Sequence, residues 1–412
     1  MNKNQKLVKF ACYSGNVSMS VAANISPILF ITFHSLYGIS YSLLGFLVLI
    51  NFLTQLTIDL IFSFFSHKFN IKATVKTMPL LTVLGLVIYA MSPILFPNNI
   101  YVGLVIGTFI FSASSGLGEV LLTPVIAALP SNDPDREVSK LHSIYAWGVV
   151  LVVIFSTIFL TVLGTSYWQW LAIIFTVIPI LSAILFSISD IPNVQPPKKA
   201  SNALQTLKNR TLWICVLAIF LGGAAECTMA QWASGYLEKA LGLPKILGDT
   251  FGVALFALMM AIGRTLYSKS GKNIEKLLIL GSFGATVCYA LTAISPFPIL
   301  SLITCVLTGF CVSMMWPGTL ILTSDLITDS SVIMYAMLAA GGDFGASVGP
   351  QLVGLIADFA SQNKTALVLA NNLNLSPDQL GMKLGIIVST FFPFLAIFIF
   401  SKLYKLKKQN SK

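Results

Sequence analysis

Long runs of apolar residues, separated by short polar segments, form the main pattern of this chain. A helix needs about 20 apolar residues to cross the hydrocarbon core of a lipid bilayer. Twelve stretches reach this length, at residues 8–33, 42–65, 74–95, 100–129, 140–163, 168–189, 211–237, 249–269, 276–295, 298–325, 332–359 and 382–404. The pattern therefore predicts an all-α membrane protein with twelve transmembrane helices.

Two of the connections between these stretches are long, at residues 190–210 and 360–381. The first connection, DIPNVQPPKKASNALQTLKNR, combines proline, lysine and small polar residues, a composition typical of linkers. It leaves six predicted spans on each side. We therefore predict an N-terminal six-helix bundle over 1–189, a cytoplasmic linker over 190–210 and a C-terminal six-helix bundle over 211–412.

Charged residues are few and unevenly distributed. Only 10% of the 412 residues are charged, whereas a soluble domain has about 25%, so the composition excludes a soluble protein. If the N-terminus is inside, 21 of the 25 lysines and arginines fall on the cytoplasmic side, as the positive-inside rule requires. We therefore predict a multi-pass protein of the cytoplasmic membrane with both termini in the cytoplasm. The net charge of +10 then follows from topology and indicates no nucleic-acid partner.

Four of the fifteen acidic residues lie well inside predicted spans: Asp59, Glu119, Glu226 and Asp343. A charged carboxylate at the bilayer centre costs at least about 2.5 kcal/mol, so such residues usually face the protein interior or water and are functional candidates. Glu119, in the segment SSGLGEVLLTP, has no basic residue in its stretch. We predict proton-coupling roles for Glu119, Glu226 and Asp343. The alternative for each is a protonated side chain that hydrogen-bonds between helices and serves packing.

Asp59 differs from the other three acids because it lies near the predicted cytoplasmic end of its span. Lys68 follows in the next loop, and Arg264 lies near the cytoplasmic end of a span in the second half. The sequence predicts a structural or gating ion pair between Asp59 and one of these two cations.

Neutral polar and aromatic side chains at the depth of a central cavity are candidates for substrate binding. Small-molecule sites combine aromatic walls with a few polar groups that fix the orientation of the ligand. The candidates are Asn24, Asn51, Gln55, Tyr145, Gln231, Trp232 and Trp316. For each aromatic residue the alternative is packing in the core or against lipid.

Several sequence motifs of other protein classes do not occur in this chain. A GxxxxGK[ST] loop is missing, which excludes an ATP-driven pump within this chain. GxSxG and HExxH motifs are also missing, which argues against a hydrolase. The six cysteines show no CxxC or Cys/His ligand spacing, so we predict no metal, cofactor or disulfide. We therefore predict that the protein is not an enzyme.

The two halves carry similar features at corresponding positions. A basic loop follows the second span of each half, FFSHKFNIKATVK and GRTLYSKSGKNIEKLL, and the fourth spans contain the proline segments GEVLLTP and SMMWPGTL. This six-plus-six layout resembles the major facilitator superfamily across essentially the whole chain. Within it, GLGEVLLTP followed by LHSIYAWG, together with GGAAECTMAQWASGYL, resembles the fucose-permease-like group of sugar–proton symporters. Where that group has an acid in its first span, this chain has SVAANISPILF, without a carboxylate.

The resemblance implies a secondary transporter that works by alternating access between its two bundles. Its substrate would be a monosaccharide or a related polyol, coupled to protons through Glu119. It would act as a monomer in the lipid bilayer. Two alternatives stay open: a proton-coupled exporter of drugs or metabolites with the same fold, and a membrane receptor that binds a ligand without transporting it.

Overall fold

A computed structural model describes residues 3–65, 68–130, 134–192, 208–270, 273–327 and 332–410. Within these ranges every long regular element is a helix and no strand is found. Ten helical segments there are long and apolar enough to cross a membrane. The other two predicted spans, 249–269 and 332–359, are helical as well, in α12 (Leu255–Ser270) with the π-helical turn before it and in α16 (Val332–Gln362). The predicted all-α architecture with twelve spans is confirmed.

The helices form two compact units. Unit 1 comprises Met1–Gly38 and Ile50–Lys198, and unit 2 comprises Ile39–Leu49 and Lys199–Lys412. The long helix α2 (Tyr41–Phe65) therefore begins in unit 2 and continues in unit 1. Residues 193–207 of the predicted linker lie outside the described residues, so the boundaries predicted for the two bundles stay a prediction.

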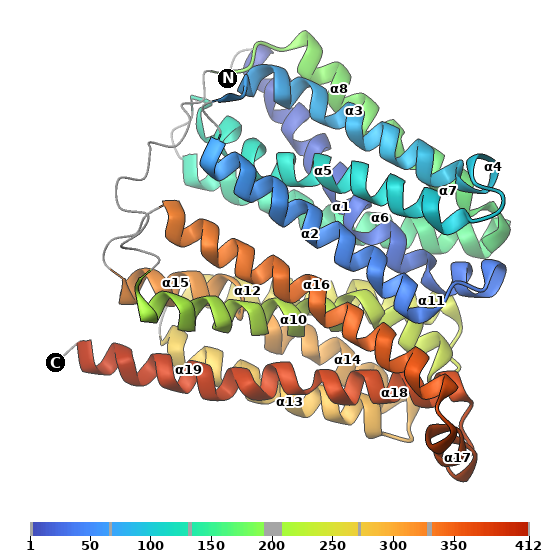
Figure 1. Ribbon diagram of the computed structural model, residues 1–412. Helices are drawn as coiled ribbons and strands as arrows, with labels where there is room; N and C mark the ends of the chain where they lie inside the picture. The colour runs from blue at the N-terminus through green and yellow to red at the C-terminus, as the bar shows by residue number, and fades with distance from the viewer. Residues whose placement is uncertain are drawn as a thin grey trace. The chain divides into compact units, whose positions relative to one another are not determined.

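Unit 1 contains most of α2 and the helices α1 (Lys3–Tyr37), α3 (Ile71–Ala90), α4 (Ser92–Leu95), α5 (Ile100–Ala127), α6 (Pro134–Leu163), η2 (Thr165–Tyr167), α7 (Trp168–Phe175) and α8 (Val177–Ile188). Helices α3 and α5 lie side by side (Figure 1). They approach closely at Gly85, where an added Cβ would lie 2.6 Å from the backbone nitrogen of Phe111. Small residues of this kind allow membrane helices to pack backbone against backbone.

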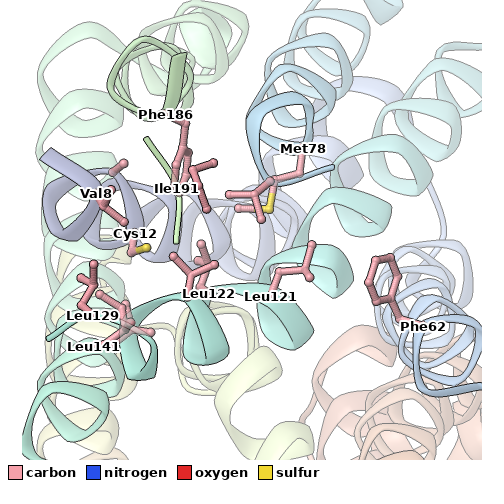
Figure 2. Close-up of a cluster of buried hydrophobic side chains, with 14 residues drawn as sticks. Val8, Cys12, Phe62, Met78, Leu121, Leu122, Leu129, Leu141, Phe186 and Ile191 are labelled. Carbon is pink, nitrogen blue, oxygen red and sulfur yellow. The ribbon is translucent and has the colours of Figure 1, made fainter. Parts of the chain in front are cut away.

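The apolar core of unit 1 lies among α1, α2, α3, α5, α6 and α8. Figure 2 shows its main side chains, which are Val8, Cys12, Phe62, Met78, Leu121, Leu122, Leu129, Leu141, Phe186 and Ile191. Leu122 of α5 is 1% exposed and Val8 of α1 is fully buried. Because α5 supplies several members of this cluster, its orientation in unit 1 is fixed by packing, and with it the position of Glu119.

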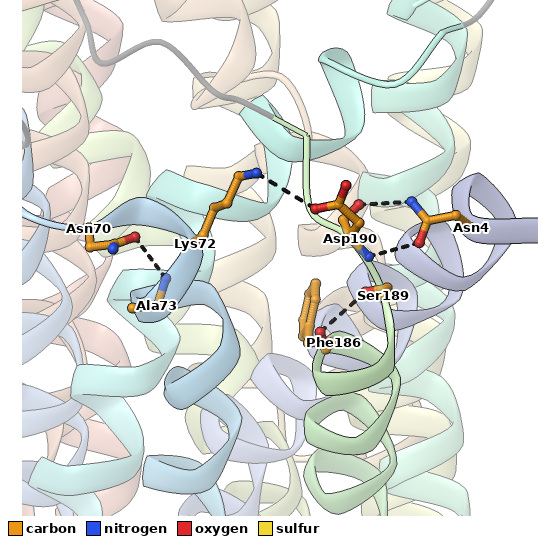
Figure 3. Close-up of polar contacts among 7 residues, drawn as sticks. All are labelled: Asn4, Asn70, Lys72, Ala73, Phe186, Ser189 and Asp190. Carbon is orange, nitrogen blue, oxygen red and sulfur yellow. Dashed lines mark hydrogen bonds and ion pairs between the residues drawn. The ribbon is translucent and has the colours of Figure 1, made fainter.

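Polar contacts join the two ends of unit 1 (Figure 3). The side-chain amide of Asn4 donates to the carbonyl of Asp190 at 2.8 Å, and the Asp190 backbone N–H donates back to Asn4 Oδ1 at 2.8 Å. Lys72, in the first turn of α3, lies 3.6 Å from the Asp190 carboxylate. The Asn70 side chain caps the same helix by accepting a bond from the Ala73 N–H at 3.1 Å. These contacts hold the start of α1, the start of α3 and the end of α8 together.

Unit 2 contains α10 (Arg210–Lys239), α11 (Lys245–Leu247), η3 (Gly248–Ala254), α12, α13 (Ile274–Ile294), α14 (Pro298–Val312), α15 (Pro317–Leu326), α16, α17 (Lys364–Asn372), α18 (Pro377–Ser389) and α19 (Phe391–Asn410). Helices α10 and α16 run side by side in Figure 1 and make the most extensive helix pair among the described residues. Any side chain at Gly345 of α16 would collide with the Phe220 carbonyl of α10. This pair therefore forms the rigid centre of unit 2.

Candidate functional site

In unit 1 a line of polar side chains on α2 faces a line of polar side chains on α5. Asn51, Gln55 and Asp59 of α2 are spaced four residues apart and share one face of the helix. The Gln55 amide donates to Asn51 Oδ1 at 2.9 Å, and the Ser112 hydroxyl of α5 donates to the same oxygen at 2.6 Å. A Cβ added to Gly116 would lie 3.1 Å from the Cα of Gln55, so the two helices are in close contact here.

Glu119 continues the polar face of α5. It lies seven residues after Ser112, which returns to nearly the same direction at about 100° per residue. Its side chain is exposed, but it does not lie on the exposed apolar stripe of the helix. That stripe contains Ile106 and Phe109, and Phe109 lies about 80° away from Glu119 around the helix axis. Glu119 therefore belongs to the face that α5 presents to α2.

Asp59 is the other carboxylate of this region. Its side chain is 8% exposed, its Oδ1 has no hydrogen-bond partner among the described residues, and it lies in the electrostatic field of Glu119. Among the described residues of unit 1, no basic side chain forms an ion pair with Asp59. The ammonium group of Lys68 lies 5.1 Å from the centre of the Phe65 ring. Unit 1 therefore holds two neighbouring acids whose charges no described cation offsets.

The other candidates of unit 1 lie at the contact between α1 and α6. Asn24 donates to the Ser20 carbonyl of its own helix at 2.9 Å, and the Ser20 hydroxyl donates to the Tyr145 carbonyl of α6 at 2.9 Å. A Cβ added to Gly148 would lie 2.6 Å from the Ser20 hydroxyl oxygen. Asn24 and Tyr145 are both partly exposed. Both residues therefore lie near Ser20, at the contact between the two helices.

In unit 2 the guanidinium group of Arg264 on α12 binds Glu226 on α10. Its Nη2 donates to both carboxylate oxygens, at 3.3 and 3.4 Å, and the side chains are 43% and 15% exposed. Its Nε donates to the carbonyl of Ser313 at 3.0 Å. No partner for Nη1 lies among the described residues. Arg264 thus offsets the charge of Glu226 and keeps one nitrogen available for a ligand.

The Ser313 carbonyl is available to Arg264 because of Pro317. In a continuous α-helix that carbonyl would accept a bond from the N–H four residues later, but residue 317 is proline and has no N–H. The chain accordingly leaves the helix between α14 and α15. At Gly263, the neighbour of Arg264, an added Cβ would lie 2.9 Å from the Cβ of Ser313, so α12 approaches the break closely. Pro317 thus leaves the Ser313 carbonyl free, and Gly263 provides the space that lets Arg264 reach it.

Asp343 and Trp316 lie near this ion pair. Asp343 is 5% exposed, and the thiol of Cys227 lies in the electrostatic field of both Glu226 and Asp343. The Trp316 ring packs on Gly342, where an added Cβ would lie 2.5 Å from a ring carbon. Unit 2 therefore brings two predicted proton-coupling residues and one predicted substrate-binding ring into one region.

Gln231 and Trp232 are more deeply buried. Trp232 is 0% exposed, and its indole N–H donates to the Pro350 carbonyl at 2.8 Å. Gln231 is 7% exposed, and its Oε1 has no described hydrogen-bond partner. The surroundings of Trp232 are those of a packing residue, whereas Gln231 retains an acceptor that a ligand can use.

Two further features bear on what these regions can bind. A cavity of about 420 Å³ in unit 2 is lined by apolar residues of α16, α18 and α19 and by two threonines, Thr286 of α13 and Thr390 between α18 and α19. No candidate residue lines it. In the described part of the chain no group of three or more His, Cys, Asp or Glu side chains is arranged to hold a metal ion.

Another ion pair in unit 1 joins α1 and α6. The Lys9 ammonium contacts the Glu137 carboxylate, and Lys140 donates to Glu137 Oε1 at 3.2 Å. The hydrogen bond from Lys9 is the main cause that holds the pKa of the Glu137 carboxyl below its usual range. The apolar pattern did not single out Glu137, because this residue lies outside the predicted span 140–163.

Comparison with known proteins identifies the family. A profile of the Major Facilitator Superfamily matches residues 11–350. The chain belongs to this superfamily. It is therefore a multi-pass membrane protein of a family of secondary transporters. No curated protein matches the chain significantly in sequence.

Several solved structures resemble the chain over nearly its whole length. A bacterial homologue of the human lysosomal transporter Spinster, inward-facing and unoccupied, has a TM-score of 0.80, 12% identity and coverage of 99% of this chain and 98% of that chain. The D-xylose–proton symporter has a TM-score of 0.71, 16% identity and coverage of 95% and 96%. The E. coli fucose:proton symporter has a TM-score of 0.59, 17% identity and coverage of 96% and 99%. At these identities the likeness shows the fold alone.

Proposed function

We propose that this chain transports a monosaccharide or a related polyol by alternating access, coupled to protons through Glu119. The observation that carries the proposal is the contact between the polar faces of α2 and α5. There Asn51, Gln55 and Ser112 form a hydrogen-bonded group beside Asp59 and Glu119. Amide and hydroxyl groups suit a ligand rich in hydroxyls, and a carboxylate without a cation can bind and release a proton.

Unit 2 supplies the second part of the proposal. Glu226 bound to Arg264 is an ion pair at membrane depth, and such groups mark substrate and ion pathways. Protonation of Glu226 would remove the negative charge and free the guanidinium group for a substrate oxygen. Asp343 lies close enough to act as a second titrating group, and Gln231 and Trp316 are the substrate contacts that we infer in this unit. Because span 1 has no acid, Glu119 takes the coupling role together with an acid of unit 2.

Two solved relatives with this fold are consistent with the substrate class. One is a D-xylose–proton symporter and the other a fucose:proton symporter. The short motifs around Glu119 and Glu226 resemble the fucose-permease-like group, to which we assign the chain.

The test is counterflow in proteoliposomes with a panel of labelled sugars and polyols. We expect exchange of at least one of them, and accumulation of the same compound when an inward proton gradient is imposed. Exchange of nucleosides or organic cations, without exchange of any sugar, would replace the proposal by the exporter alternative. Binding without exchange would replace it by the receptor alternative.

The orientation of the chain is proposed from the distribution of basic residues, with both termini in the cytoplasm, and we propose a monomer. Reporter fusions at the two termini are expected to give the cytoplasmic signal. A fusion after Asn98, in the loop before α5, should give the opposite signal. The inverse pattern would reverse the direction of transport deduced from any uptake assay.

A further inference from the structure

The apolar cavity of unit 2 lies at the junction of α18 and α19, two helices that pack beside α13 (Figure 1). Val388 of α18 and Phe391 and Phe394 of α19 line it. Their side chains are 43%, 58% and 44% exposed. The cavity therefore opens on the surface of the protein.

Pro393 explains why the two helices are interrupted at this point. Helix α18 ends at Ser389 and α19 begins at Phe391. In a continuous helix the Ser389 carbonyl would accept a hydrogen bond from the N–H of residue 393, but proline has no N–H. The helical segment Pro377–Gln409 is long and apolar enough to cross a membrane. The interruption, and the cavity beside it, thus lie near the middle of a membrane span.

The walls of the cavity suit a hydrocarbon ligand. Its two hydroxyl groups already donate to carbonyls of the preceding helical turn, Thr286 to Ser282 at 2.8 Å and Thr390 to Ile386 at 3.2 Å. The other lining side chains are aliphatic or aromatic. An apolar cavity of about 150 Å³ binds benzene, so the volume of about 420 Å³ found here accommodates a longer apolar group.

One exposed face of α19 runs from the cavity to the polar end of the helix. Phe391, Phe394, Phe398, Lys402 and Lys405 lie within about 80° of one another around the helix axis. All five side chains are exposed. The rings of Phe394 and Phe398 meet edge-on, with 5.2 Å between their centres. This face is therefore apolar next to the cavity and basic at its far end.

The lysines of α19 differ in their partners. Lys407 lies about 140° around the helix from Lys402, and it contacts Asp325 at 2.7 Å and Glu275 at 3.5 Å. Within the described ranges no carboxylate forms an ion pair with Lys402 or Lys405. The ammonium groups of these two exposed lysines are therefore available to an anion from outside the protein.

The separation between the cavity and the two lysines matches half of a bilayer. Lys402 follows Phe391 by eleven residues, which is about 16 Å along a helix. One leaflet contributes about 15 Å of hydrocarbon. A phospholipid whose phosphate group contacts Lys402 and Lys405 would therefore bring the end of its acyl chain to the cavity.

We propose that the exposed face of α19 and the cavity at its start bind one anionic phospholipid. The phosphate group contacts the ammonium groups of Lys402 and Lys405, because basic residues at the end of a membrane helix attract anionic head groups. The acyl chain runs along Phe398 and Phe394, and its last methylene groups fill the cavity. The site lies within unit 2 and requires only that α19 crosses the bilayer.

The experiment is photo-crosslinking of the full chain in phosphatidylcholine nanodiscs. The probe is phosphatidylglycerol with a diazirine at the end of one acyl chain, and peptide mass spectrometry locates the label. We expect label at Val388, Phe391 and Phe394, and several-fold less label from a phosphatidylcholine probe with the same chains.

The head-group contact is tested by Lys402→Gln combined with Lys405→Gln. Each lysine near an anionic head group contributes about fivefold to binding. Half-maximal labelling by the phosphatidylglycerol probe should therefore need about 25 times more lipid, and the preference over phosphatidylcholine should disappear. Both side chains are exposed, so the double variant keeps the packing of α19.

A matched control removes two lysines of the same spacing elsewhere in the chain. Lys3 and Lys6 are exposed and lie three residues apart on α1. Lys3→Gln combined with Lys6→Gln should leave the labelling unchanged. Val388→Trp tests the cavity, because the larger ring occupies it. This variant should lose the label at Phe391 and Phe394 although both lysines of the site remain.

Three outcomes would overturn the proposal. The first is equal labelling by the two probes, and the second is an equal loss in the control at Lys3 and Lys6. The third is a crosslink from a photoreactive phenylalanine at position 391 to a second copy of the chain in place of lipid, which would assign this face to a dimer. None of these outcomes bears on the proposed substrate, which counterflow tests separately.

Discussion

The hydroxyl of Ser112 is the group that joins the polar faces of α2 and α5, through its 2.6 Å bond to Asn51. Ser112→Ala should lower the free energy of unfolding by about 1 kcal/mol, because it leaves a buried acceptor with one partner fewer. Thermal unfolding in detergent measures the effect. Ser115→Ala is the matched control, since the Ser115 hydroxyl bonds only to the Phe111 carbonyl of its own helix at 3.2 Å. Equal losses in the two variants would contradict the bridging role of Ser112.

Glu137 gives stability a dependence on pH. Its hydrogen bond from Lys9 holds the pKa of the carboxyl below the value in the unfolded chain. A lowered pKa means that the pair stabilises the fold above the unfolded pKa of about 4.3 and loses this effect as pH falls through the folded pKa. The contribution of this pair to the free energy of unfolding is below about 1 kcal/mol, because the pair is partly exposed to solvent.

The comparison for this prediction is between the wild type and Glu137→Gln. Their melting temperatures should differ most at neutral pH, and the difference should shrink as pH falls below about 4.3. A difference that stays constant between pH 7 and pH 4 would show that the charge of Glu137 is not what stabilises the contact of α1 with α6.

At the scale of elements, the break between α14 and α15 positions Arg264. Pro317→Ala would return an N–H to the Ser313 carbonyl and compete with Arg264 Nε. We expect counterflow to fall several-fold, because Arg264 is then held by Glu226 alone. Thermal stability should stay level, because Pro317 is the first residue of α15 and proline is tolerated at that position of a helix.

A second proline separates this effect from a general effect of proline removal. Pro298 begins α14, where its missing N–H would have no helical partner. Pro298→Ala should therefore leave counterflow unchanged. Full transport by Pro317→Ala would show that the bond from Arg264 to Ser313 does not matter for the reaction.

Sequence periodicity predicted these elements well because each membrane span must bury about 20 apolar residues, a property that can be read along the chain. It also selected Glu119 and Glu226, because a carboxylate in an apolar run is conspicuous. It could not find the partner of Arg264, since Glu226 lies 38 residues earlier on another helix and that contact depends on how the helices pack. Pro317 alone indicated that the Ser313 carbonyl is free to accept a hydrogen bond, because proline has no N–H for the carbonyl four residues before it.

The surroundings of the first turn of α2 could not be predicted from the sequence. The backbone N–H of Tyr41 donates to the carboxylate of Asp358. The two residues are 317 positions apart and neither lies in a motif, so their contact depends on how the helices pack.

For the whole molecule, the decisive prediction separates proton coupling from substrate exchange. Counterflow needs substrate on both sides and no net proton movement, whereas accumulation against a gradient requires the proton. Glu119→Gln keeps the size and hydrogen-bonding capacity of the side chain and removes its titration. We expect this variant to retain counterflow and to lose most of the proton-driven accumulation. The proton uptake that accompanies accumulation is measured with a pH dye inside proteoliposomes.

Glu275→Gln is the matched control for this whole-molecule prediction. Glu275 lies in the first turn of α13 and contacts Lys407 at 3.5 Å, away from the candidate residues. It should leave both activities intact. Undiminished proton uptake in Glu119→Gln would remove Glu119 from the coupling role and leave Glu226 and Asp343, near each other in unit 2, as the acids that carry the proton.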